Sequence, residues 1–377
     1  MSLINRDIRR NLDKTTVKII NEEKLYQPIK TPDDPAPTFI KNVNPNGNSG
    51  ASLSDDGTIL WGRRVNLVSK SVDKGKTFVD TVMPGLETSM THLEILKDGH
   101  ILAWTLNSTT GQGKVFKSSN TALDATTTWG EKLAFEHGMP HYGQFGLSVH
   151  NNVIIFNEYI NVVGQTGNGR HVWLSTDFGE TWKNVLTLPD NSPDQHHAHD
   201  SCFDPYTKWL WVCTGDGIEY RNVYYSKDFG DTWETLWVQG QAPAQFTNVI
   251  ARPECVLFGT DSLTEWFVYR YDKETEVIDV IYSITPTAGT QPLLAAKARN
   301  IVESDGTVVT YIPWRAQAQD NKWRVLATAD GYNFYPLYIT PVVDGSGLAN
   351  VLGVSDDGDL LIQGSGFTGI MQKPNFK

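Results

Sequence analysis

The chain has 377 residues, of which 40% are hydrophobic and 20% charged, as is ordinary for a packed globular protein. Its 32 basic and 43 acidic residues give a net charge of −11, and no run of Lys or Arg is present, which argues against sequence-independent binding to nucleic acid or an anionic membrane. Three cysteines without metal-ligand spacing do not indicate a disulfide framework, and no segment approaches the roughly 18 apolar residues of a membrane span.

The first 36 residues differ from the rest of the chain. Ile4, Ile8 and Leu12 lie at helical spacing, which predicts a short helix that would be marginal alone and would pack on copies of itself or on a larger assembly. A frayed terminus is the alternative. Residues 31–37 read as a stiff, proline-rich linker. The N-terminus lacks the apolar core of a signal peptide, so we expect synthesis in the cytoplasm without export by the usual route.

From about residue 50 the sequence predicts only strands, in seven successive groups. Asp-Gly pairs at 56–57, 98–99, 305–306 and 357–358 each join the first two strands of a group, and Asp-Gly between strands is a strong hairpin signal. We therefore expect an all-β ring of four-stranded antiparallel blades, most simply seven, with six or eight as alternatives. The last group lacks a fourth strand, and residues 37–42 could supply it and close the ring.

A repeated turn ends the third strand of several groups. It has the form S-x-D-x-G-x-T-W at 175–182 and 226–233, with Phe in place of Trp at 71–78 and a shortened copy at 328–334. Asp and Ser side chains can bond nearby backbone amides, and Gly supplies a positive φ. Thr and Trp then begin the next strand, where β-branched and aromatic residues pack well.

This turn resembles the Asp-box, or BNR repeat, of sialidase-like β-propellers, a family that mostly handles glycans. The resemblance implies a propeller over residues 37–377, with the boxes on its outer edge, opposite the face that carries chemistry. Asp73, Asp177 and Asp228 would then mark the fold and take no part in catalysis. The Arg-Ile-Pro motif of true sialidases is absent, and Arg252-Pro253 is a poor substitute, so a true sialidase is not expected.

The densest polar cluster at a central-face position precedes and enters the first strand of group four. His197 and His199 are two apart, so on a strand they point to the same side, with Asp200 on the other side. They could bind a divalent metal such as Zn²⁺, or one could act as a general base; no other cofactor is expected. Neighbouring strand exits offer Glu158, Tyr159, Asp216 and Asp261. The alternative is that the histidines bond polar strand ends and the two aspartates serve turns.

Aromatic and basic residues occupy comparable exits in other groups. Rings stack on the apolar faces of sugars, and a guanidinium forks onto carboxylate or phosphate, so such pairs suit carbohydrate. Packing between blades or surface ion pairs is the alternative role. The residues concerned are Trp61, Arg63, Trp104, Trp314 and Arg315.

An Asp-box propeller without a signal peptide, preceded by a short attachment helix, resembles some bacteriophage tail receptor-binding proteins. We therefore expect a virion tail protein that recognises a cell-surface glycan or wall polysaccharide, with residues 1–30 joining copies of the chain or the virion. The alternative is an enzyme: a glycoside hydrolase with Asp216, Asp261 or Glu158 as its two carboxylates, or a polysaccharide lyase with His197 or His199 beside Tyr159. A structural or protein-binding propeller is the third possibility.

Overall fold

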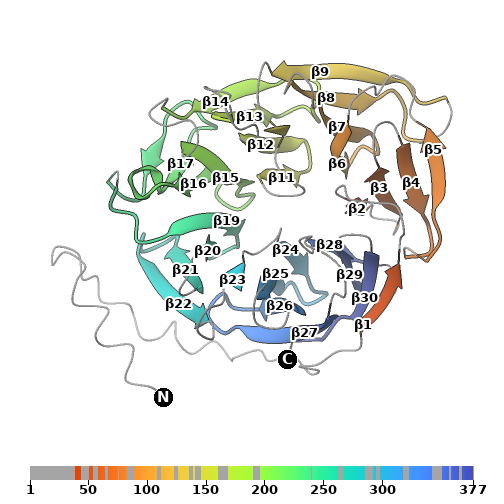
Figure 1. The fold of residues 1–377 in the computed structure, drawn as a ribbon. Helices are drawn as coiled ribbons and strands as arrows, with labels where there is room; N and C mark the ends of the chain where they lie inside the picture. Colours follow the sequence, from red (N-terminus) through yellow and green to blue (C-terminus); the bar gives the residue numbers. More distant parts are fainter. Residues whose placement is uncertain are drawn as a thin grey trace.

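The fold is a ring of antiparallel sheets (Figure 1). The computed structural model describes residues 39–43, 51–53, 58–63, 67–74, 76–82, 89–107, 112–122, 126–135, 139–140, 146–159, 169–189, 196–238, 240–261, 266–284, 292–293, 298–316, 322–341, 350–355, 358–364 and 367–376. The predicted N-terminal helix and linker lie outside these residues, so the division at residue 36 stays a prediction. None of the described residues forms a helix long and apolar enough to cross a membrane.

The described strands form seven sheets, here called blades and numbered in chain order. Blade 1 contains β2 (Ala51–Leu53), β3 (Ile59–Arg63), β4 (Leu67–Ser71) and β5 (Val79–Val82). Blade 2 contains β6 (Ser89–Ile95), β7 (Ile101–Leu106), β8 (Gly113–Ser118) and β9 (Trp129–Phe135). Blade 3 contains β10 (Met139–Pro140), β11 (Leu147–His150), β12 (Val153–Tyr159), β13 (His171–Ser175) and β14 (Lys183–Thr187).

Blade 4 contains β15 (His196–Phe203), β16 (Leu210–Asp216), the short 3₁₀ helix η4 (Ile218–Tyr220), β17 (Asn222–Ser226) and β18 (Glu234–Thr235). Blade 5 contains β19 (Gln245–Ala251), β20 (Cys255–Asp261), β21 (Trp266–Asp272) and β22 (Ile278–Ile284). Blade 6 contains β23 (Pro292–Leu293), β24 (Arg299–Val302), β25 (Val308–Ala316), β26 (Lys322–Thr328) and β27 (Tyr335–Pro341). Blade 7 contains β28 (Asn350–Val354), β29 (Asp359–Gly364), β30 (Phe367–Gln372) and β1 (Phe39–Val43).

The predicted all-β propeller of four-stranded antiparallel blades is confirmed. Two blades depart slightly from the pattern, because their innermost strand is interrupted. In blade 3, β10 and β11 both pair with β12, and in blade 6, β23 and β24 both pair with β25.

The ring is closed by the strand that the sequence predicted for this role. β1 pairs antiparallel with β30 from Phe39 opposite Met371 to Val43 opposite Phe367. Blade 7 therefore combines the two ends of the described chain, and its outer strand comes from the start of the chain (Figure 1). Covering β30 removes an edge that would otherwise present unpaired backbone groups.

Each Asp-box turn is held by its own side chains. In blade 3, Asp177 Oδ1 accepts hydrogen bonds from Thr181 N at 2.9 Å and from Ser175 Oγ at 2.8 Å, while Asp177 Oδ2 accepts from Thr181 Oγ1 at 2.6 Å. Ser175 Oγ also accepts from Gly179 N at 2.8 Å. Gly179 has a φ of +77°, and the preceding Phe178 also lies in the left-handed region at +58°, so the turn needs two left-handed residues.

The box aspartates are stabilised in their charged form. Hydrogen bonds from the Thr232 side chain and backbone and from Ser226 lower the pKa of Asp228 from 3.8 to about 2. At Asp177, partial burial raises the pKa, but the hydrogen bonds outweigh it and the net pKa is lowered. Because the folded pKa lies below the unfolded one, these carboxylates contribute stability above about pH 4. That contribution is lost as the pH falls through the lowered values.

Each box turn also packs against the preceding blade. A Cβ added at Gly179 would lie 2.9 Å from Leu102 of blade 2, and one at Gly230 would lie 2.5 Å from Val185 Cβ of blade 3. The indole of Trp233 donates from Nε1 to the carbonyl oxygen of Val185 at 2.7 Å. The boxes therefore join blades as well as shaping single turns.

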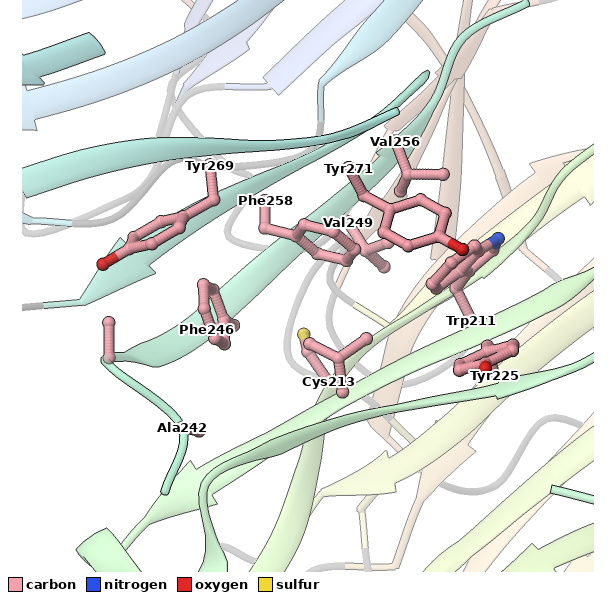
Figure 2. Packing of buried hydrophobic residues seen from close by; sticks show 12 residues of the cluster. Trp211, Cys213, Tyr225, Ala242, Phe246, Val249, Val256, Phe258, Tyr269 and Tyr271 are labelled. Carbon is pink, nitrogen blue, oxygen red and sulfur yellow. The ribbon is translucent and has the colours of Figure 1, made fainter. Parts of the chain in front are cut away.

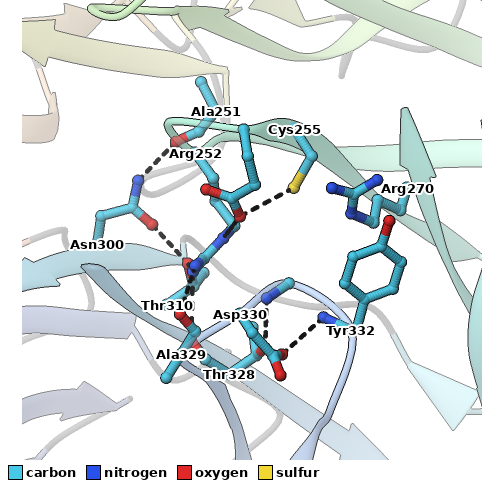
Figure 3. Close-up of polar contacts among 12 residues, drawn as sticks. Ala251, Arg252, Cys255, Arg270, Asn300, Thr310, Thr328, Ala329, Asp330 and Tyr332 are labelled. Atoms are coloured by element: carbon cyan, nitrogen blue, oxygen red, sulfur yellow. Dashed lines mark hydrogen bonds and ion pairs between the residues drawn. The ribbon is translucent and has the colours of Figure 1, made fainter. Parts of the chain in front are cut away.

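Aromatic side chains fill the contact between blades 4 and 5 (Figure 2). Trp211 lies with its ring centroid 5.2 Å from both Tyr225 and Tyr271, and Phe246 lies 5.7 Å from Phe258. All five side chains are buried, so packing between sheets accounts for these aromatic residues.

The strand register separates two ends of the blades. In blade 3, Ser175, which begins the box, pairs with Ile154 at the start of β12, whereas Val172 pairs with Asn157 near the end of β12. In blade 4, Ser226 likewise pairs with Leu210 at the start of β16. We call the end with the box turns the box end and the opposite end, where β12 and β16 finish, the loop end. In these two blades the boxes thus lie away from the predicted site residues, as expected.

Contact between a box and the preceding blade can be tested with glycine substitutions. Gly306, in the hairpin of blade 6, has a φ of +84° with nothing within 4 Å of an added Cβ, so Gly306→Ala should cost only the left-handed strain, about 1–2 kcal/mol. Gly230→Ala, at a similar φ of +85°, should lose a further 1–3 kcal/mol or so from overpacking on Val185. Denaturant unfolding measures both; equal losses would mean that the blades are not in contact here.

Candidate functional site

The innermost strand of blade 4 contains a β-bulge at the predicted histidines. Ala198 pairs with Thr214 and Asp200 with Cys213, so His199 is an extra residue between them. The sequence predicted regular alternation here. Even so, the rings of His197 and His199 are neighbours, with centroids 4.8 Å apart.

Tyr159 completes a cluster with the two histidines. It ends β12 of blade 3, and its ring centroid lies 4.7 Å from that of His197 and 6.5 Å from that of His199. Only 3% of His197 and 7% of His199 are exposed, whereas Tyr159 is partly exposed. The structure therefore brings these three predicted residues together, with the two histidines buried and the tyrosine partly exposed.

Gly215 makes room for two further polar side chains beside this cluster. A Cβ at Gly215 would lie 3.1 Å from Gln245 Cγ, 3.3 Å from His199 Cε1 and 3.5 Å from Arg221 Cγ. Sequence reasoning missed Gln245 and Arg221. Gln245 stands two residues before the bulge of β19, the position that His197 holds in β15, so aligning the blades residue by residue would have found it.

The tautomer of His199 follows from its hydrogen bond. Nδ1 lies 2.9 Å from the carbonyl oxygen of Phe246 in blade 5, and because a carbonyl only accepts, Nδ1 carries the proton. In the neutral ring, Nε2 then holds the lone pair. A histidine oriented in this way has the form required of a general base.

Asp200 holds the strand that carries the histidines. Its Oδ1 accepts hydrogen bonds from Gly146 N of blade 3 at 2.7 Å and from Ser201 N at 3.0 Å, and its Oδ2 accepts from Val249 N of blade 5 at 2.9 Å. One buried carboxylate therefore connects three blades. Asp200 supports the site and does not line it.

Glu158 is not brought to His197 and His199. It is fully buried, and its Oε1 accepts from Trp173 Nε1 at 2.8 Å while its Oε2 lies 3.0 Å from His171 Nδ1. Successive residues of a strand point to opposite faces, so Glu158 and Tyr159 face different neighbours. The structure thus separates Glu158 from the cluster it was predicted to join.

For Asp216 and Asp261 the structure describes the position of the backbone only. Asp216 ends β16 opposite His196, and Asp261 ends β20 opposite Gln245, so both strand exits adjoin the cluster. Their side chains lie outside the described part of the structure. No group of three or more His, Cys, Asp or Glu side chains that could hold a metal ion occurs among the described residues. Metal binding by His197 and His199 stays a prediction.

The Trp and Arg candidates of other blades lie apart from this cluster. Trp314 is 5% exposed and Trp104 is 2% exposed, and each is part of a hydrophobic core between blades, which favours the packing alternative. Arg63 ends β3 of blade 1, and Arg315 pairs with Trp323 in blade 6. The side chains of Trp61, Arg63 and Arg315 lie outside the described part.

Comparison with known proteins shows the fold. No protein-family model and no curated protein matches the chain. Solved structures do: virginiamycin B lyase from Staphylococcus aureus (15% identity, TM-score 0.59, 89% of this chain and 99% of that one) and YCF48 bound to D1 peptide (12%, 0.57, 92% and 99%). The GH74 xyloglucanase from Xanthomonas campestris matches over 88% of this chain and 52% of its own (12%, 0.59). These β-propellers include glycoside hydrolases and lyases, and the chain shares their fold.

Removing the Asp200 carboxylate should weaken the ring at the site. Asp200→Ala leaves buried amide donors of blades 3 and 5 without acceptors, at about 1–3 kcal/mol each. Asp200→Asn keeps the shape and one acceptor oxygen, so it should lose less. Denaturant unfolding compares the two variants; an Asp200→Ala protein as stable as the unmodified chain would contradict this role.

Proposed function

We propose that the protein recognises a carbohydrate through the loop end of blades 3, 4 and 5. The observation that carries this proposal is the cluster of Tyr159, His197 and His199 beside Gly215. It joins residues from neighbouring blades at one place, at the end of the strands that is free of box turns.

The chemistry of the cluster suits a sugar. Tyr159 is partly exposed and offers an aromatic face, while Arg221 and Gln245 offer polar groups next to it. Ligand sites typically combine apolar and aromatic surface with a few well-placed polar groups. Tyr159 contacts the rings of the buried histidines, which limits the freedom that its own ring would lose on binding.

The biological setting is part of the same proposal. The chain would be a bacteriophage tail protein whose Asp-box propeller reads a cell-surface or wall polysaccharide, and residues 1–30 would join copies of it or attach it to the virion. The repeated box and the helical spacing of Ile4, Ile8 and Leu12 support this setting. The glycoside hydrolases that share the fold support carbohydrate as the ligand class.

A second function is favoured by one observation, the orientation of His199. Because Nδ1 donates its hydrogen bond to the Phe246 carbonyl oxygen, Nε2 could accept a proton from a sugar carbon next to a carboxylate, as a polysaccharide lyase requires. A glycoside hydrolase would need two carboxylates across the scissile bond, and Asp216 and Asp261 are the candidates whose backbones adjoin the cluster.

Binding and turnover can be separated in one experiment. Bacterial wall and capsule polysaccharides are incubated with the protein. Polysaccharide bound to the protein and soluble cleavage products are then both measured. Tyr159→Ala should weaken binding by about tenfold or more, which corresponds to about 1.4 kcal/mol, because it removes the aromatic anchor of the site. Tyr206→Ala is the control, because Tyr206 is 43% exposed but lies at the box end.

The outcomes decide between the functions. Binding without products supports recognition, whereas products that disappear in His199→Gln establish the enzyme. Equal loss of binding in the Tyr159 and Tyr206 variants, or no retention of any polysaccharide, would contradict the proposal.

A further inference from the structure

An ion pair joins two blades that are not neighbours in the ring. Arg299 begins β24, on the inner side of blade 6, and Glu94 lies in β6, the innermost strand of blade 2. Arg299 Nη2 lies 3.7 Å from Glu94 Oε1. Figure 1 shows β6 and β24 on different sides of the ring centre, so the two side chains meet across it.

Glu94 and Arg299 differ in how much of their hydrogen-bonding capacity is used. Glu94 Oε2 lies 3.1 Å from His92 Nε2, within hydrogen-bond distance, and only 9% of its side chain is exposed. Arg299 is 27% exposed, and its distance to Glu94 is too long for a hydrogen bond. Its Nε is buried and has no acceptor among the described residues. The donors of this guanidinium are therefore largely unused.

The buried ion pair that joins blades 6 and 7 looks different. Lys373 Nζ lies 2.7 and 2.6 Å from the two carboxylate oxygens of Glu303, and its side chain is 9% exposed. Such short contacts suit a permanent link between blades. The long Arg299–Glu94 contact does not use the planar fork of arginine, which matches a carboxylate through two parallel hydrogen bonds.

We propose that Arg299 binds the carboxylate of an acidic sugar, in competition with Glu94. The ligand carboxylate would take the unused donors of the guanidinium, and Glu94 would keep its bond to His92. This inference goes beyond the proposed function, on which its choice of a sugar rests, and it names acidic glycans as the ligand class of the ring centre. A chain of net charge −11 repels anions in general, so a dedicated cation at the ring centre is the element that would admit one.

The test uses a matched pair of small probes on the full chain. Galacturonate and galactose differ by one carboxylate, and their binding is measured by ligand-observed NMR titration. Arg299→Gln should weaken galacturonate binding by about tenfold or more, because hydrogen bonds to a charged group are lost. Glu94→Gln should strengthen it several-fold, since the internal competitor is removed. Galactose binding should be equal in all variants.

Two more variants serve as controls, one for the shape of the guanidinium and one for the loss of a positive charge elsewhere. Arg299→Lys keeps the charge without the fork and should show an intermediate loss, with folding checked by thermal unfolding. Lys114→Gln removes an exposed cation that pairs with Glu131 at 2.7 Å and should change nothing. Galacturonate binding unchanged in Arg299→Gln, or absent from both the unmodified chain and Glu94→Gln, would overturn the inference. Polysaccharide retention that depends on Tyr159 would still leave the proposed function standing.

Discussion

The contact between each box turn and the blade before it is the interaction on which the rest of the structure depends. At Gly230 this contact leaves no room for a Cβ, and Trp233 adds a hydrogen bond to the same neighbouring strand. The turn geometry, with two left-handed residues and a charged aspartate, places Gly179 and Gly230 each against the preceding blade. In blades 3 and 4 this contact joins each sheet to the one before it, and the pairing of β1 with β30 closes the ring.

Because the box turns that join neighbouring blades lie at one end of the strands, the residues at the other end are not needed for that packing. The box end of blades 3 and 4 is committed to turns, while the loop end brings Tyr159, His199 and Gly215 together from neighbouring blades. Fold and function are separable for the same reason: a lyase, a xyloglucanase and a peptide-bound protein share this architecture. The role of this chain must therefore be argued from its own side chains.

The sequence predicted those features that depend on local chemistry. The box turns, the hairpins and the closing strand at residues 37–42 follow from turn residues and alternating hydrophobicity. The bulge at His199 could not be predicted, because it depends on pairing with β16. Glu158 was assigned to the wrong neighbours, since which face of β12 meets blade 4 is decided by packing between sheets. The contact of Arg299 with Glu94 joins distant blades, which no local pattern indicates.

We propose that recognition takes place at the loop end and that the box turns only build the ring. Backbone hydrogen exchange, measured with and without a bound wall polysaccharide, tests this most directly because it locates the ligand on the chain. We expect slowed exchange at residues 157–159, 197–199 and 215–221, with the box turns at 175–182 and 226–233 unchanged. Slowed exchange confined to the box turns would contradict it.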